Sequence, residues 1–186
     1  PRLSIVMPCH NAGATVGEAV ESIQRQTHSD WELICYDDGS TDATAAVIRA
    51  MAEQDPRIRL TGGERVGIVS ALARACDEAA APLLARMDAD DIAHPDRLTL
   101  QEEVMRADCG IGLCGTGVRM IGPELGEGRL RYEEWLNSLE SHEDIQRELF
   151  IECPIVHPTF MIRRDAYDAI GGYQDHGWAE DYDLCM

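Results

Sequence analysis

The sequence predicts an α/β fold with a mostly parallel central sheet and helices on both faces. Apolar runs rich in β-branched residues alternate with segments of helical periodicity, and acidic clusters directly follow two of these runs. The 186 residues, 45% of them hydrophobic, are enough for one well-buried core. We therefore expect a single domain over residues 1–186. The abrupt end at Met186, without a helix terminator, favours a domain truncated at its C-terminal end.

The first half of the chain is predicted to alternate between strands and helices. Thr15 and Glu18 have the spacing of a capping box and open a helix that should end near Gln26. The Asp55-Pro56 pair ends the next helix, because the residue before a proline disfavours helical backbone. The strands are expected at residues 3–7, 31–36, 58–60 and 82–87, and the helices from residue 15 and over residues 43–54 and 67–80.

The second half is less regular. A helix is expected to begin near Asp96, a strand interrupted by glycines covers residues 111–121, and residues 132–150 are mostly helical. Residues 157–162 have the pattern of a late strand. A glycine turn at residues 171–173 then precedes a last acidic segment over residues 180–183.

The charge of the chain excludes several functions. A formal net charge of -18 argues against DNA or RNA as a partner, because nothing here would displace the counterions of phosphates. An acidic enzyme that handles a nucleotide would need a divalent cation. All sixteen basic residues are arginine, and the absence of lysine excludes a P-loop, Schiff-base chemistry and a phospho-receiver domain.

The cysteines and the hydropathy pattern bear on location. The seven cysteines are odd in number, and several lie in apolar runs, which indicates small buried side chains in a reducing compartment. No stretch is long and apolar enough to span a bilayer, and no charged-then-apolar leader opens the chain. We therefore expect a cytoplasmic protein without a transmembrane segment.

Two acidic clusters fall at the carboxyl ends of predicted strands, the edge at which open α/β sheets bind ligands. Asp88-Ala89-Asp90 follows the fourth strand, and Mg²⁺ or Mn²⁺ usually binds through one or two carboxylates together with substrate phosphates. Asp37-Asp38 follows the second strand and would need a cation or a hydrogen-bond donor as a partner. Ordinary turn and helix-capping chemistry is the alternative for both clusters.

Taken in order, these residues resemble the signatures of family 2 glycosyltransferases. The resemblance extends from Pro8 to Asp183, nearly the whole chain, and implies a GT-A type fold that binds a nucleoside diphosphate sugar. The matching segments are Met7-Pro8-Cys9-His10-Asn11, Asp37-Asp38-Gly39-Ser40-Thr41-Asp42, Asp88-Ala89-Asp90-Asp91, Pro95-Asp96-Arg97-Leu98, Gly171-Gly172-Tyr173 and Glu180-Asp181.

The resemblance implies a role for each matching position. Pro8 and His10 would line the nucleobase pocket, although His10 departs from the commoner tyrosine, and Asp38 would accept a hydrogen bond from the base, usually uracil. Asp88 would face the ribose or metal region, and Asp90 would be the protein ligand of Mn²⁺ or Mg²⁺ on the diphosphate.

The family reaction, by resemblance, is inverting transfer of a sugar to an acceptor hydroxyl, with Asp181 as the general base. In such a transfer one carboxylate takes the acceptor proton while a cation stabilises the leaving diphosphate. The acceptor would be a carbohydrate or a lipid-linked molecule, and the latter would bring the enzyme to the inner face of the membrane. Helix capping is the alternative role for Glu180 and Asp181.

Other functions and residues are weaker candidates. A sugar nucleotidyltransferase, or a module that binds a nucleotide sugar without transferring it, would share the fold; the former should carry a basic glycine-rich loop after the first strand. Arg65 is interpreted as an exposed arginine that binds no ligand. The alternative is that its side chain reaches the diphosphate. His157 is interpreted as a structural hydrogen-bonding residue, and Trp178 as a residue bordering an acceptor sugar.

Overall fold

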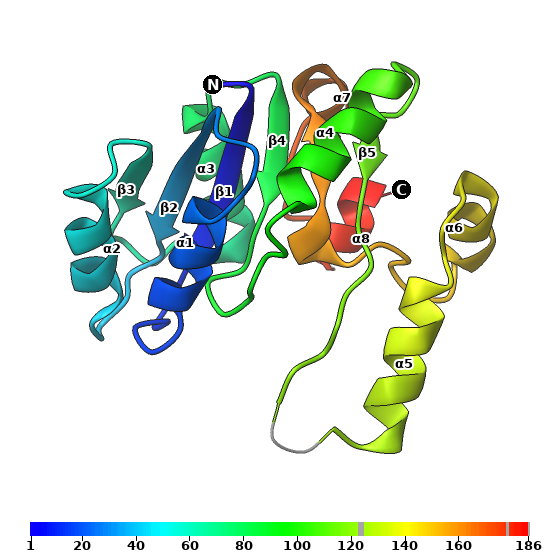
Figure 1. Ribbon diagram of the computed structural model, residues 1–186, viewed down its shortest axis with the longest axis horizontal. Helices are drawn as coiled ribbons and strands as arrows, with labels where there is room; N and C mark the ends of the chain where they lie inside the picture. The colour runs from blue at the N-terminus through cyan, green and yellow to red at the C-terminus, as the bar shows by residue number, and fades with distance from the viewer. Residues whose placement is uncertain (123–124, 178, 186) are drawn as a thin grey trace.

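The structure is a computed structural model that describes residues 1–122, 125–177 and 179–185. Its centre is a six-stranded sheet of order β3-β2-β1-β4-β6-β5 (Figure 1). The strands from β1 to β4 are parallel, whereas β6 runs antiparallel to both β4 and β5. Their bounds are β1 Leu3–Cys9, β2 Trp31–Asp37, β3 Ile58–Gly62, β4 Leu83–Arg86, β5 Leu113–Cys114 and β6 Met161–Arg163.

Helices cover both faces of the sheet, as predicted, so the α/β fold is confirmed. Alternate side chains of β1 point to opposite faces, with Leu3 and Ile5 in a core shared with α1, α2 and α4. Val6 belongs to a second core shared with α3, α7 and α8. The helices are α1 Val16–Gln24, α2 Thr44–Ala52, α3 Ile68–Glu78, α4 Arg97–Ala107, α5 Glu127–Asn137, α6 His142–Glu148, α7 Arg164–Ala169 and α8 Glu180–Cys185, with a 3₁₀ turn η1 at His157–Thr159.

The first half of the chain follows the prediction within about two residues at most boundaries. The capping box is the exception. The Thr15 side chain makes no cap hydrogen bond to the helix and donates instead to the carbonyl oxygen of Ala12 at 3.3 Å. The local tetrapeptide pattern is therefore overridden by the turn that precedes α1.

The second half departs further from the prediction. The strand expected over residues 111–121 is reduced to β5. After β5 the chain passes so close to another segment that a Cβ on Gly115 would lie 2.3 Å from Ile155 Cγ2. The late strand is divided into η1 and β6, and residues 132–150 form parts of two helices. Trp178 lies outside the described residues.

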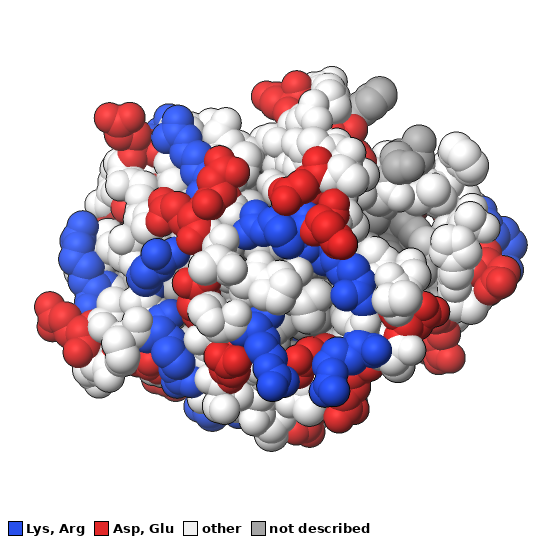
Figure 2. Space-filling model, turned by 90° about the horizontal axis from the view of Figure 1, so that it is seen from above, with Lys and Arg blue, Asp and Glu red and all other residues white. Residues whose placement is uncertain are grey.

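The surface is charged on the face that lies opposite the carboxyl ends of the strands. Figure 2 shows this face, at the top of Figure 1, with acidic and basic side chains interspersed and no broad basic area. In the described part of the chain, no helix is long and apolar enough to cross a membrane. Among the large apolar side chains of the described residues, the two most exposed follow α6: Phe150 is 80% and Ile151 is 74% exposed.

Two adjacent glycines at the end of β3 allow a test of how closely this strand end packs against β2. Gly62 has φ 83° and its Cβ would lie 2.5 Å from the Asp37 carbonyl oxygen, whereas Gly63 has φ 121° and would meet nothing within 4 Å. We expect Gly63→Ala to lower the free energy of unfolding by about 1–3 kcal/mol through backbone strain alone. Gly62→Ala should cost clearly more, because backbone atoms must also move. Urea denaturation of both variants checks this, and equal losses would contradict it.

Candidate nucleotide-binding site

Three parallel strands end side by side at one edge of the sheet and bring the predicted residues together. Val6 pairs with Arg86, and Cys9 with Asp37, so the residues after β1, β2 and β4 emerge next to each other. A cavity of about 340 Å³ opens between the loop after β1 and the loop after β4. Its lining includes four of the predicted residues, Pro8, His10, Asp88 and Asp90.

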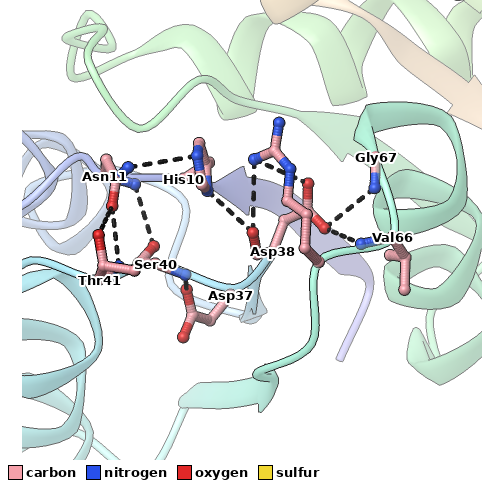
Figure 3. A network of polar contacts seen from close by, with 9 residues as sticks. His10, Asn11, Asp37, Asp38, Ser40, Thr41, Val66 and Gly67 are labelled. Atoms are coloured by element: carbon pink, nitrogen blue, oxygen red, sulfur yellow. Dashed lines mark hydrogen bonds and ion pairs between the residues drawn. The ribbon is translucent and has the colours of Figure 1, made fainter.

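His10 is held by both of its ring nitrogens. Nδ1 lies 2.9 Å from the carbonyl oxygen of Asp38, which can only accept, so Nδ1 carries the proton and donates. Nε2 lies 3.2 Å from the side-chain nitrogen of Asn11 and accepts from it (Figure 3). These contacts occupy the edge of the imidazole, and the residue is exposed. A face of the ring is therefore left for a stacking partner.

Asn11 fastens the loop after β1 to the loop after β2. It has φ 51°, a left-handed conformation that asparagine tolerates better than most residues. Its backbone N–H donates to Ser40 Oγ at 3.0 Å, and its Oδ1 accepts from the Thr41 N–H at 2.9 Å (Figure 3). The two loops that surround His10 thus form one cross-linked unit.

Asp42 adds a second link between the same loops. Its Oδ2 accepts from the Gly13 N–H at 2.9 Å, and its Oδ1 accepts from the Thr44 N–H at 3.0 Å. The Thr44 hydroxyl also donates to Oδ1, and this bond, followed by those from the Thr44 and Gly13 N–H groups, lowers the pKa of Asp42. The carboxylate is therefore ionised at neutral pH and acts as a turn and capping residue, as the alternative interpretation of this cluster predicted.

Asp38 is buried and ties its loop to the start of α3. Its Oδ1 accepts from the N–H groups of Val66 and Gly67, at 2.5 and 3.1 Å (Figure 3). Its Oδ2 lies 3.3 Å from Arg65 Nη1, so this arginine, although 58% exposed, is paired with a carboxylate. Asp38 does not line the cavity around Asp90. Oδ2 retains a lone pair that can accept a further hydrogen bond.

Asp88 has a buried partner that the sequence analysis missed. Arg86 Nη2 lies 2.6 Å from Asp88 Oδ1, and the Arg86 side chain is 7% exposed. Its Nε and Nη1 have no hydrogen-bond partner among the described residues. The signal was available, since a single charged residue in the otherwise apolar strand before Asp88 requires a partner.

A second buried arginine supports the end of β4. Arg97 Nη2 donates to the Arg86 carbonyl oxygen at 2.7 Å, and Arg97 Nε donates to Gln101 Oε1 at 3.0 Å. Burial, and then the charge of Arg86, lowers the pKa of Arg97 to about 10, so the guanidinium stays charged at neutral pH. The Pro95-Asp96-Arg97-Leu98 signature therefore holds the strand that delivers Asp88 and Asp90.

The residues at this edge fit a divalent cation that shares its ligands with a substrate. Exclusion of water by neighbouring protein atoms, and then the charges of Asp88 and Asp90, raise the pKa of Asp91. Nearby carboxylates of this kind are stabilised by a cation. No group of three or more metal-binding side chains exists within residues 1–122, 125–177 and 179–185. One or two carboxylates are what Mg²⁺ or Mn²⁺ needs when phosphate oxygens complete its shell.

Asp181 lies in the first turn of α8. Its Oδ1 accepts from the Tyr182 N–H at 2.7 Å. It is not among the residues that line the cavity. The structure therefore brings the predicted nucleotide and metal residues together but leaves the predicted base on a separate helix.

Comparison with known proteins decides the family. The sequence model of the family described as "Glycosyl transferase family 2" matches residues 4–171 of the chain. The chain belongs to glycosyl transferase family 2. An Escherichia coli relative, the O-antigen biosynthesis glycosyltransferase WbnJ, is 31% identical over 99% of this chain and 70% of its own length. The resemblance seen in the sequence is thus confirmed.

Solved structures confirm that this family 2 chain has the GT-A fold. The mannosyltransferase PcManGT from Pyrobaculum calidifontis, in complex with GDP-Man and Mn²⁺, superimposes with a TM-score of 0.77 at 21% identity, over 99% of this chain and 50% of its own. S. aureus TarS 1-349 in complex with UDP-GlcNAc superimposes with a TM-score of 0.77 at 16% identity. The match covers 100% of this chain and 52% of the TarS chain. The chain spans 60%, 58% and 70% of the length of three curated relatives.

Proposed function

We propose that this chain transfers a sugar from a nucleoside diphosphate sugar, UDP-linked, to an acceptor hydroxyl, with a divalent metal and with inversion at the anomeric carbon. The observation that carries the proposal is the cavity at the carboxyl edge of β1 and β4, lined by Pro8, His10, Asp88 and Asp90 in a family 2 chain. The solved relatives bound to GDP-Man with Mn²⁺ and to UDP-GlcNAc support a donor of this class.

Binding of the nucleobase is assigned to His10 and Asp38. The free face of the His10 ring suits stacking on a flat heterocycle, since its ring nitrogens are already paired within the protein. Asp38 Oδ2 would accept from the imide N–H of uracil, with Arg65 beside it. The hydrogen bonds from Val66 and Gly67 to Oδ1 hold the carboxylate in one orientation before the nucleotide arrives.

The diphosphate and its metal are assigned to the loop after β4. Asp90 is exposed and would be the protein ligand of Mn²⁺ or Mg²⁺, with Asp88, oriented by Arg86, facing the ribose or the metal. The bound cation would neutralise the charge that develops on the departing diphosphate. Asp88 and Asp90 would hold this cation, and Arg86 orients the Asp88 carboxylate through their ion pair.

The acceptor side is assigned to α8. Asp181 would take the proton of the attacking hydroxyl, and the loops beyond the donor edge would set the choice of a carbohydrate or a lipid-linked acceptor. A module that binds a nucleotide sugar without transferring it is the competing function. Transfer by the full-length protein, measured as nucleoside diphosphate release with and without acceptor glycans, separates the two, because a binding module releases none.

The Asp38 assignment gives a specific prediction on donor choice. Asp38→Asn keeps a carbonyl oxygen that can accept from Val66 and Gly67 but replaces the second oxygen by an amide group, which cannot accept from the base. We expect the preference for UDP over other nucleoside diphosphates to fall by about 10- to 100-fold, the range of one hydrogen bond in a buried site. Calorimetry with UDP, GDP and ADP measures it.

The matched control for this variant is Asp42→Asn, which alters a carboxylate of the same turn that faces Gly13 and Thr44. Its selectivity among nucleoside diphosphates should match that of the unaltered protein. Unchanged selectivity in Asp38→Asn would show that Asp38 serves only to fasten α3.

A further inference from the structure

A buried polar chain outside the cavity connects η1 to α8. His157 is 7% exposed, and its Nε2 lies 2.8 Å from the hydroxyl of Tyr173. Its Nδ1 lies 3.6 Å from Glu180 Oε1, at the start of α8. The His157 ring also meets Phe160 edge-on, with 5.0 Å between the ring centroids. One side chain therefore contacts two segments that lie 16 and 23 residues further along the chain.

His157 is tied to the strand that delivers the donor-site acids. The Arg86 N–H donates to the Phe160 carbonyl oxygen at 2.9 Å, and Ala85 pairs with Met161 in the sheet. Arg86 itself holds Asp88. The position of η1 is thus set by the end of β4, only a few residues before the proposed metal ligand.

The protonation of this chain follows from its burial. Burial, and then the charge of Arg86, lowers the pKa of His157 to about 2, so the ring is neutral at physiological pH and carries one N–H. Burial also raises the pKa of Tyr173 well above its usual value, so its hydroxyl stays protonated. A carboxylate can only accept, which places the ring proton on Nδ1. Tyr173 then donates to Nε2, and His157 directs its Nδ1–H at Glu180.

Other contacts hold α8 as well: the Tyr182 hydroxyl donates to the Leu149 carbonyl oxygen, and the His176 ring nitrogen Nδ1 lies 2.9 Å from an Asp183 carboxylate oxygen. Leu184 packs in the core that contains Leu84 of β4, and Cys185 Sγ lies 3.7 Å from Cys153 Sγ. At its first turn, Glu180 lies next to His157, whose 3₁₀ turn η1 is joined to the end of β4. The contact between His157 and Glu180 therefore relates the turn that carries Asp181 to β4.

We propose that His157 is a positioning residue, whose neutral Nδ1–H holds Glu180 and so sets the turn that carries Asp181 relative to β4. The inference rests on the proposed role of Asp181 as the base. His157 does not exchange a proton with substrate. The 3.6 Å separation is longer than a full hydrogen bond, as is common before a substrate is bound.

Two substitutions of His157 distinguish the contribution of Nδ1 from that of Nε2. The side-chain nitrogen of asparagine falls near the position of Nδ1, whereas that of glutamine reaches the position of Nε2. In the full-length protein, His157→Gln should lower kcat for transfer by about 10- to 100-fold, the effect of a small misplacement of a reacting group. His157→Asn should stay within about threefold, because the donor to Glu180 is kept. Donor affinity, measured by calorimetry, should be unchanged in both.

Hydrogen exchange supplies a readout that does not depend on activity. The amides of residues 181–185 should exchange faster in His157→Gln and at the unaltered rate in His157→Asn, while thermal unfolding reports any loss of global stability. Asp181→Asn is measured alongside. If it transfers sugar normally, the base assignment fails, yet the exchange comparison still tests the positioning. Equal transfer by the two His157 variants, or unaltered exchange in His157→Gln, would overturn the proposal.

Discussion

Asp181→Asn should abolish most sugar transfer while donor binding persists. A general base acts on the acceptor hydroxyl and does not touch the nucleotide, so its loss should lower the rate by about 10²–10⁴-fold. Asp181 lies on α8 and is not among the residues that line the cavity with Pro8, His10, Asp88 and Asp90, so we expect little change in UDP or metal affinity. Transfer by the full-length protein and donor calorimetry are the two measurements.

The controls for this prediction are neighbouring carboxyl groups. Glu180→Gln keeps an oxygen that can accept from His157 Nδ1 and should cost less than Asp181→Asn. Asp165→Asn alters an exposed carboxylate of α7 and should leave transfer unchanged. Near-normal transfer by Asp181→Asn, or a loss of donor affinity in proportion to the loss of activity, would move the search for the base to another residue.

Asp90→Asn should remove the dependence of nucleoside diphosphate binding on a divalent cation. In the unaltered protein we expect UDP to bind tightly with Mn²⁺ and weakly with a chelator. The variant should bind UDP with Mn²⁺ at least about 10-fold more weakly, because even partners outside the ligand shell of a metal contribute that much. The chelator should then have little further effect. Calorimetry under the four conditions measures the coupling directly.

Asp91→Asn is the matched control for Asp90, because it removes one charge from the same turn. Its pKa is raised by exclusion of water and by Asp88 and Asp90, so its loss relieves repulsion without removing the proposed ligand. Its binding should remain dependent on Mn²⁺. Equal UDP affinity with Mn²⁺ and with chelator in the unaltered protein would refute metal-dependent binding altogether.

Much of the donor edge could be predicted because it follows from local patterns. Continuous apolar strands and helices of regular periodicity place the residues after β1, β2 and β4 at one edge of any parallel sheet. That argument brings His10, Asp88 and Asp90 together without knowledge of a single contact. The roles of these residues in nucleotide and metal binding stay predictions.

The partners of the site residues could not be predicted in the same way. Asp38 is held by N–H groups that lie 28 and 29 residues further along the chain. The Arg86 partner of Asp88 lies only two residues away, yet the burial of its side chain is seen only in the structure. Such contacts are set by packing between distant segments, on which sequence periodicity carries no information.

By itself, the sequence determined the α/β class, the succession of strands and helices along the first half of the chain, and the family to which the chain belongs. These properties depend on periodicity and on short ordered signatures, both of which are local. Only the tertiary structure decided that the 111–121 segment is barely a strand, that Asp38 accepts hydrogen bonds from the start of α3, and that Asp181 does not line the cavity. Each of these features depends on how distant segments of the chain pack against one another, which local sequence patterns do not encode.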